Sequence, residues 1–330
     1  MQQPFYGKNQ KKGVFEIMGK VKSNTQKAYK ARQRSFHIML FIPCLVLFIF
    51  NYLPIFGLVM AFQNFQPGLG FLKSEWVGLK NFQTLMQLPN FFPALRNTLV
   101  IAVGKIIGNL VIPIAFALML NEVRNKWFKK TAQTITYLPY FLSWIVLSGI
   151  FINFLSQGST QSDTGFLNTV LMNIGFVKEP IDFLGNKNLF PWVMIFTDVW
   201  KNFGYNAIVY LAALTGIDPG LYEAAAIDGA GRWKQTLHVT LPGIAPIIVL
   251  MTVLSIGNIL NAGFDQIFNM YSASVYSTGD IIDTLVYRLG MVNQQYSLSA
   301  AVGFFKSAVS GILIVVSYKL AEKFAGYRVF

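Results

Sequence analysis

Six long apolar runs dominate this chain, and each approaches or exceeds the ~20 residues that an α-helix needs to cross a bilayer. The runs lie at residues 36–62, 95–120, 131–155, 189–214, 244–267 and 299–320. Of the 330 residues, 54% are apolar and 12% are charged, and that charged share is roughly half of the ~25% typical of soluble domains. Backbone groups inside a bilayer must be satisfied within the spanning segment, which favours helices. The sequence therefore predicts an all-α polytopic membrane protein with six transmembrane helices.

Basic residues are distributed unevenly among the segments that connect these runs. The first 35 residues hold nine Lys and Arg and one acidic residue, Glu16. Six spans leave both termini on one side of the membrane. If that side is the cytoplasm, 18 Lys and Arg are cytoplasmic and six lie in the outer loops, as the positive-inside rule requires. We therefore expect a basic cytoplasmic tail at 1–35 and a six-helix transmembrane domain at 36–330, with both termini cytoplasmic.

The chain lacks the residue patterns of an enzyme or a metal site. The Gly-Lys pair at Gly104 has neither the upstream glycine nor the following Ser or Thr of a phosphate-binding loop. His37 and His238 are far apart, and Cys44 is the single cysteine, so no cluster has metal-ligand spacing. The net charge of +13 is not accompanied by the interleaved stacking aromatics that bind single-stranded nucleic acid. We expect no catalytic residue, no metal ligand and no nucleic-acid partner.

The loop between the fourth and fifth runs, 218–242, is polar enough to lie in water. Asp218 suits an N-cap and Pro219 the first helical position. Gly229 and a second glycine two residues later end this short helix. We expect a second short helix that returns to the membrane and stops at Pro242. The predicted result is an L-shaped pair of helices whose alanine-rich surface suits docking of another protein.

The same loop resembles the Glu-Ala-Ala loop of binding-protein-dependent ABC importer permeases. The residues that carry the resemblance are Glu223, Ala224, Ala225, Asp228, Gly229, Ala230, Trp233, Leu241 and Pro242. The Asp-Gly-Ala-Gly-x-Trp continuation is similar to the maltose-type branch, and the chain from about residue 36 onward is similar to the LplB-like oligosaccharide and polysaccharide permeases. One departure is Thr236, where maltose-type loops commonly have phenylalanine.

The resemblance implies a type I ABC importer permease that moves oligosaccharides across a bacterial cell membrane and is not itself an enzyme. Its implied partners, besides membrane lipid and the oligosaccharide, are a second homologous permease in a heterodimer, a dimer of ATP-binding subunits and an extracellular solute-binding lipoprotein. ATP and Mg²⁺ would be held by the ATP-binding subunits, so no cofactor is expected in this chain. The ATPase-coupling residues carried over are Glu223, Ala224, Ala225, Asp228, Gly229 and Trp233.

Two groups of polar residues inside the apolar runs are candidates for the lining of a translocation path. The fourth run contributes, at helical spacing, Asp198, Lys201, Asn202 and Tyr205. The fifth run contributes Asn258, Asn261 and Asp265, with Phe264 beside them. Ionisable groups inside spans are costly and usually face a cavity or a partner, and a sugar site needs polar groups for hydroxyls and apolar or aromatic surface for the ring.

Other interpretations of these residues are open. Asp198 and Lys201 could form an internal ion pair while the asparagines bond neighbouring helices. Lys105 and Lys306 could line the path or stabilise the contact with a partner permease.

The function also has alternatives. The chain could be an ABC permease for a non-sugar solute, an ion-coupled secondary transporter, or a membrane scaffold or receptor subunit without transport. Inverted repeats and broken helices are typical of secondary transporters, and the sequence contains no convincing internal repeat.

Overall fold

The computed structural model describes residues 29, 32–158 and 163–325. The basic tail predicted at 1–35 lies almost entirely outside these residues. The chain divides into two compact units, Met1–Val59 and Met60–Phe330.

The first unit contains residues 32–59 of the apolar helix Arg32–Phe62. The helix includes a π-helical turn, η1 (Phe48–Tyr52), followed by the 3₁₀ segment η2 (Leu53–Phe62). Pro54 accounts for the irregularity, because proline has no N–H to donate within a helix. No side chain from 32 to 56 is buried within the chain, as expected for a helix that faces lipid or another protein. The first predicted run is confirmed as a helix.

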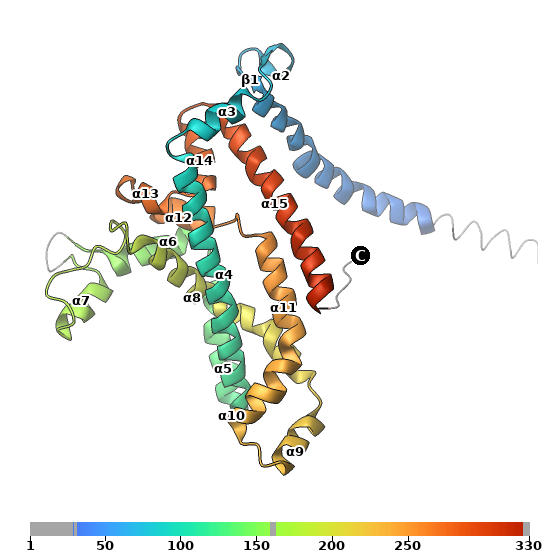
Figure 1. Ribbon diagram of the computed structural model, residues 1–330, viewed down its shortest axis with the longest axis vertical. Helices are drawn as coiled ribbons and strands as arrows, with labels where there is room; N and C mark the ends of the chain where they lie inside the picture. Colours follow the sequence, from blue (N-terminus) through green and yellow to red (C-terminus); the bar gives the residue numbers. More distant parts are fainter. Residues whose placement is uncertain (1–28, 30–31, 159–162, 326–330) are drawn as a thin grey trace, which may run out of the picture. The chain divides into compact units, whose positions relative to one another are not determined.

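In the second unit, helices make up nearly the whole structure (Figure 1). Two short antiparallel strands pair Gln63 with Trp76. The elements in order are β1 (Gln63–Asn64), α2 (Gly70–Lys73), β2 (Glu75–Trp76), α3 (Lys80–Gln87), α4 (Phe91–Glu122), α5 (Lys126–Tyr137), η3 (Leu138–Phe141), α6 (Trp144–Leu155), α7 (Phe166–Asn173), α8 (Phe190–Thr215), α9 (Pro219–Ile227), α10 (Arg232–Gln235), η4 (Thr236–Thr240), α11 (Leu241–Gly257), α12 (Phe264–Met270), η5 (Ala273–Val275), α13 (Tyr276–Gly279), α14 (Ile282–Tyr287), η6 (Arg288–Val292) and α15 (Tyr296–Ala325).

Helical segments occupy all six predicted runs. Within the described residues, four are long and apolar enough to cross a membrane: Arg32–Phe62, Phe91–Glu122, Arg232–Gly257 and Tyr296–Leu320. The pair Lys126–Phe141 and Trp144–Leu155 makes a fifth if it counts as one bent span. Helix α8 has 26 residues and is not among these, because Asp198, Lys201, Asn202 and Asn206 lower its hydropathy. Polar residues are tolerated in a spanning helix that faces the protein interior.

Helices α4 and α8 form the centre of the second unit, and two glycines set how closely they approach. A Cβ added at Gly104 would lie 2.3 Å from Ile195 Cδ1, and one at Gly108 would lie 2.5 Å from Val199 Cγ2. Small residues at such contacts let membrane helices pack through their backbones. Buried residues of α4 and α8, including Phe190, join a core cluster with the segment 262–281. This packing fixes the polar faces of the two helices relative to each other.

Two of the predicted runs are not straight helices. The third bends by 103° between η3 and α6, just after Pro139, and α6 restarts with Ser143 as its N-cap. In the fifth, α11 ends at Gly257 and α12 begins only at Phe264. The prediction of a continuous helix was wrong for both, because breaks stabilised by contacts with other helices leave no hydrophobicity signal.

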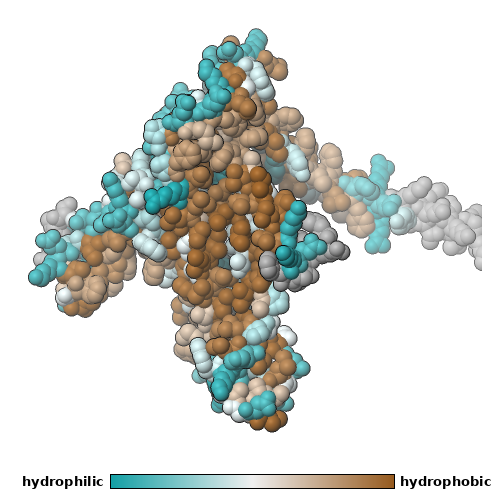
Figure 2. Space-filling view, in the orientation of Figure 1, coloured by the Kyte–Doolittle hydropathy of each residue, from teal (hydrophilic) through white to brown (hydrophobic). Residues whose placement is uncertain are grey.

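The surface of the second unit fits a membrane location. Figure 2 shows apolar surface over the middle of α4, α11 and α15, while hydrophilic residues gather near α2 and α3 and near α9 and α10. Such a distribution places the apolar middle in the bilayer and the two polar ends in water.

Candidate functional site

The predicted loop at 218–242 forms a short helix joined to a long one. The side chain of Asp218 accepts a hydrogen bond from the Gly220 N–H at 2.9 Å and caps α9. The helix ends at Ile227, and Gly229 follows with a left-handed φ of +75°, which suits glycine because it has no Cβ. The N–H of Ala230 then donates to the Ala225 carbonyl at 2.9 Å, closing the turn expected at a helix end.

The prediction that the second helix stops at Pro242 was wrong. Residues from Arg232 continue through the π-helical turn η4 into α11, so that Arg232–Gly257 is one apolar helix. The N–H of Leu241 donates to the Thr236 carbonyl across the wider turn, and Pro242 occupies the first turn of α11. A proline is tolerated there because the local π geometry has already changed the hydrogen-bond pattern.

The loop presents apolar side chains that the chain leaves uncovered. Ile227 is 87% exposed and Trp233 is 76% exposed, and Leu221 is also exposed. Among the predicted coupling residues, Glu223, Ala224, Asp228, Gly229 and Trp233 are exposed and Ala225 is half-buried.

Two contacts hold the base of this loop. Arg232 forms a 3.0 Å ion pair with Glu122 at the end of α4, and the Tyr222 hydroxyl lies 3.0 Å from that of Thr240. The first contact attaches the loop to α4, and the second joins α9 to η4. The first turn of α9 remains exposed.

A cavity of about 400 Å³ lies between α4, α8 and the end of α11. Five asparagines, one serine and one ion pair supply its polar side chains. The lining residues are Ala102, Lys105, Ile106, Asn109, Asp198, Asn202, Asn206, Met251, Leu254, Ser255, Asn258, Asn261, Ala262 and Gly263. None of these residues is aromatic.

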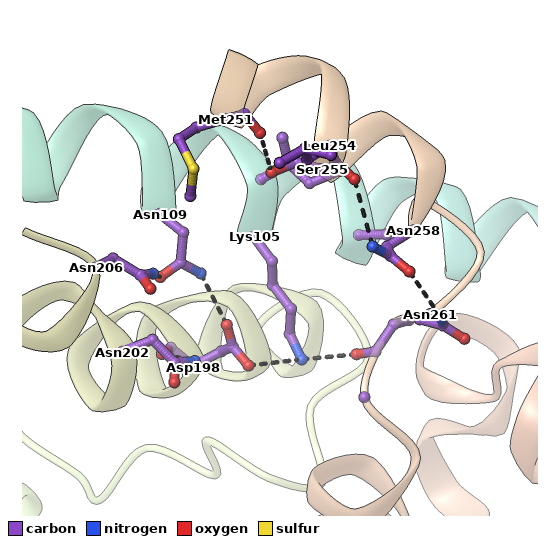
Figure 3. Close-up of a pocket in the computed structure, with 14 residues that line it drawn as sticks. Lys105, Asn109, Asp198, Asn202, Asn206, Met251, Leu254, Ser255, Asn258 and Asn261 are labelled. Carbon is purple, nitrogen blue, oxygen red and sulfur yellow. Dashed lines mark hydrogen bonds and ion pairs between the residues drawn. The ribbon is translucent and has the colours of Figure 1, made fainter. Parts of the chain in front are cut away.

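The ion pair of Lys105 and Asp198 is the electrostatic centre of the cavity (Figure 3). Lys105 Nζ lies 3.4 Å from Asp198 Oδ1, donates to the Ala262 carbonyl at 2.7 Å and also donates to the Gln266 side chain. These three partners match the three protons of an ammonium group. Asp198 Oδ2 accepts from Asn109 at 2.9 Å, so both charges are neutralised within the chain.

The same lysine also bonds the backbone at the break in the fifth run. The Ala262 carbonyl lies where no helix continues, and Lys105 satisfies it. Gly263 has a φ of +93°, and a Cβ there would lie 2.9 Å from Lys105 Nζ. The backbone conformation favours glycine at this position, and a side chain there would also displace the lysine ammonium group.

Two of the four fourth-run candidates border the cavity, and their role in a translocation path stays a prediction. Asp198 and Asn202 line the cavity, together with Asn206 one turn further on. Lys201 and Tyr205 do not, because they lie on a neighbouring face of α8 and pack against η3. Lys201 Nζ donates to the Tyr140 carbonyl at 2.7 Å, and the rings of Tyr140 and Tyr205 stack with centroids 3.8 Å apart.

The alternative of an ion pair between Asp198 and Lys201 is wrong, since the partner of Asp198 is Lys105. Lys201 instead lies over the rings of Tyr140 and Trp144, at 5.3 and 5.6 Å from their centroids. Lys201 therefore satisfies a backbone carbonyl at the bend in the third run. Lys105 does the same at the break in the fifth run.

The fifth-run group divides at the helix break. Asn258 and Asn261 line the cavity, whereas Phe264 begins α12 and stacks on Phe268 with centroids 5.1 Å apart. Asp265 also belongs to α12 and is not part of the lining. Helical spacing placed them on one face only under the assumption of a continuous helix.

Sequence reasoning missed Asn109, Asn206 and Gln266. Asn206 Nδ2 donates to Asn109 Oδ1 at 3.1 Å, and Gln266 donates to the Met194 carbonyl and to Thr197. A signal for Asn206 was present, because Asp198, Asn202 and Asn206 follow i, i+4, i+8 spacing. Lys306 has a different role from cavity lining, since it donates to Asn261 at 2.8 Å and pairs with Asp283.

A helical membrane protein with a polar cavity between its spans and an exposed helix on one of its loops has the architecture of a transporter permease. Residues 109–323 match the family described as binding-protein-dependent transport system inner membrane component. This match covers well over half of the chain, and the chain belongs to that family. It is thus a multi-pass membrane permease of the ABC transporter class.

Curated relatives extend the match to nearly the whole chain. The chain is 41% identical over 293 residues to the polygalacturonan/rhamnogalacturonan transport system permease protein YteP of Bacillus subtilis (strain 168), covering 89% of each protein. It is 41% identical over 287 residues to Protein LplB of the same organism, covering 87% of this chain and 88% of that one.

A solved structure agrees with the fold. One chain of a bacterial alginate ABC transporter, crystallised in complex with an alginate pentasaccharide-bound periplasmic protein, superposes with a TM-score of 0.80 at 34% identity. The match covers 90% of this chain and 97% of that one.

Proposed function

We propose that this chain is one of two permease subunits of an importer that moves oligosaccharides into a bacterial cell, with both termini in the cytoplasm. A dimer of ATP-binding subunits would hold ATP and Mg²⁺, and an extracellular solute-binding lipoprotein would deliver the cargo. The observation that carries the proposal is the amide-lined cavity between α4, α8 and α11. The relatives named for polygalacturonan, rhamnogalacturonan and alginate support a saccharide as the cargo.

The cavity matches the hydrogen-bonding needs of a sugar. Each asparagine side chain offers two donors and an acceptor carbonyl, so the five amides can pair with hydroxyl groups in several orientations. The internal pairing of Lys105 with Asp198 leaves no uncompensated charge on the lining. An amide surface without net charge suits a translocated sugar, because each hydrogen bond to a hydroxyl group is weak enough to exchange as the sugar moves.

The aromatic half of a sugar site is absent from this cavity. Tyr205 stacks on Tyr140 and Phe264 stacks on Phe268. Both aromatic side chains predicted for the path therefore pack on other rings of this chain. Apolar ring faces normally pack on aromatic side chains. We propose that the second permease supplies these rings across the subunit interface.

Exposed α9 would connect the cavity to ATP hydrolysis. Its uncovered Leu221 and Ile227 are typical of a protein-binding surface. Closure of the ATP-binding dimer would displace α9, and the Arg232–Glu122 pair joins this loop to α4, which lines the cavity. Rigid movement of these helices would open the cavity to alternate sides.

Transport by the reconstituted complex tests the function. Proteoliposomes that contain both permeases, the ATP-binding subunits and the solute-binding protein should accumulate labelled oligosaccharide only with ATP inside. Galacturonate and alginate oligomers and a neutral arabino-oligosaccharide would be compared with phosphate and an amino acid. Uptake that persists without ATP and collapses with an ionophore would show a secondary transporter. Uptake of the non-sugar solutes alone would show another ABC cargo.

Asn206→Ala should weaken sugar handling without disturbing assembly. The substitution removes the amide that faces the cavity and its 3.1 Å bond to Asn109. One lost hydrogen bond to the cargo corresponds to about 0.5–1.5 kcal/mol, or a roughly two- to tenfold lower uptake rate at low cargo concentration. The matched control is Asn153→Ala, whose side chain bonds only the Gly149 carbonyl on α6. Equal uptake by both variants would remove Asn206 from the path.

A further inference from the structure

A second hollow lies on α4 and α8 and shares no lining residue with the cavity around Lys105 and Asp198. It measures about 780 Å³, and it continues into a neighbouring apolar hollow of about 410 Å³ through Gly108, Trp192 and Ile195, which line both. We name these two hollows together the α4–α8 groove. Gly104 and Gly108 shape its floor, because they let the two helices approach closely.

The α4–α8 groove changes from polar to apolar along its length. Arg96, Lys187 and Asn188 line one end, beside Thr278. Beyond them the lining is almost entirely aliphatic and aromatic, and it extends to Ile112. Along α4, Arg96 and Ile112 are separated by about 24 Å at the helical rise, which exceeds the ~15 Å thickness of the hydrocarbon in one leaflet.

The two cations at the polar end have no acidic partner among the described residues. The described residues form four ion pairs, and neither Arg96 nor Lys187 takes part in any of them. The backbone beneath them is fixed, since Thr278 Oγ1 donates to the Lys187 carbonyl at 2.6 Å. Asn97 donates to the carbonyls of Ser277 and Asp280, both at 3.1 Å.

We propose that the α4–α8 groove binds a phospholipid with a net negative headgroup. Its phosphate would lie between Arg96 and Lys187, and its acyl chains would run along α4 and α8 past Trp192. A phosphate recognised by arginine and lysine forms charge-assisted hydrogen bonds, and the apolar length accommodates a full chain. The polar end lies opposite the α9 loop, so placement in the outer leaflet rests on the proposed orientation.

An apolar helix of the second permease is the competing occupant. A helix would fill the apolar part but would give no anionic partner to the two exposed cations at its end. An anionic lipid satisfies both the apolar length and the charge, which is why we favour it.

Lipid retention by the complete purified complex tests the proposal. The complex, stripped of lipid in detergent, would be incubated with phosphatidylglycerol or with phosphatidylcholine and analysed by native mass spectrometry. The wild type should retain phosphatidylglycerol preferentially, and the double variant Arg96→Gln/Lys187→Gln should retain at least fivefold less of it. The matched control Lys80→Gln/Lys178→Gln alters two exposed cations outside the groove and should retain as much as the wild type.

A second variant tests the apolar part. Ile107→Trp places a large ring in the groove lining and should lower retention of phosphatidylglycerol while leaving both cations intact. Unchanged retention in the double variant would overturn the proposal. Loss of the second permease from the double variant, with lipid unchanged, would also overturn it and identify a protein occupant. No ATP or cargo is needed, so the result is independent of the transport test.

Discussion

Replacing Lys105 with methionine is expected to destabilise the protein strongly. Lys105 is 7% exposed, and its ammonium group satisfies Asp198, the Ala262 carbonyl and Gln266. Removing one member of a buried ion pair costs about 3–5 kcal/mol, because the remaining charge is left uncompensated. We expect a clear fall in the thermal midpoint of the complex in mild detergent, together with loss of uptake.

The double variant Lys105→Met/Asp198→Asn separates charge from packing. With both charges removed, more than half of the lost stability should return, since replacing both partners costs less than orphaning one. Lys306→Met is the matched control, because the Lys306–Asp283 pair is partly solvated, with side chains 17% and 23% exposed, and its loss should cost less. Additive losses in the double variant would contradict the pairing.

Gly229→Val should uncouple ATP hydrolysis from uptake while the protein still inserts. Gly229 has a φ of +75°, and a Cβ there would meet no atom within 4 Å. The cost is therefore backbone strain, about 1–2 kcal/mol or more for a branched residue. A strain of that size shifts the population of the native turn about 5–30-fold. We expect uptake to fall about five- to thirtyfold, with ATPase activity no longer stimulated by cargo.

Gly231→Val is the matched control for that variant. Gly231 is equally exposed and a Cβ there is also unhindered, but its φ of −68° suits any residue. It should retain most uptake. Glu223→Ala removes an exposed carboxylate from α9 and should lower coupling with almost no change in stability. Equal loss in both glycine variants would show that bulk on the loop, not the left-handed turn, causes the defect.

Much of the fold follows from the sequence, because apolar length is a strong signal. Every predicted run contains helix, and the cap at Asp218 and the turn at Gly229 form as their residue types indicate. The breaks at Ser143 and Asn258 were not predictable from hydrophobicity. Each break is stabilised by a lysine from another helix, and such long-range contacts leave no local pattern.

The sequence identifies polar positions in the fourth and fifth runs, but it does not show which of them share a cavity. Of the polar residues predicted for the path, four line one cavity: Asp198, Asn202, Asn258 and Asn261. Counted from Asp198, the prediction included Lys201 at i+3 and Tyr205 at i+7. The residues that line the cavity are instead at i+4 and i+8, and the second of these is Asn206. Both sets of positions are compatible with one helix. The packing of α8 against α4 decides which set faces the cavity.

The ion pair between Lys105 and Asp198 also has a consequence for biogenesis. The ribosome makes α4 before α8, so the lysine enters the translocon while its carboxylate has not yet been synthesised. A bare lysine at the centre of an inserting helix costs about 2.5–3.5 kcal/mol on the insertion scale. The apolar residues of α4 outweigh that cost, and the emergence of α8 then removes it by pairing the lysine with Asp198. A chain that ends before α8 should therefore insert α4 but leave Lys105 without its carboxylate partner.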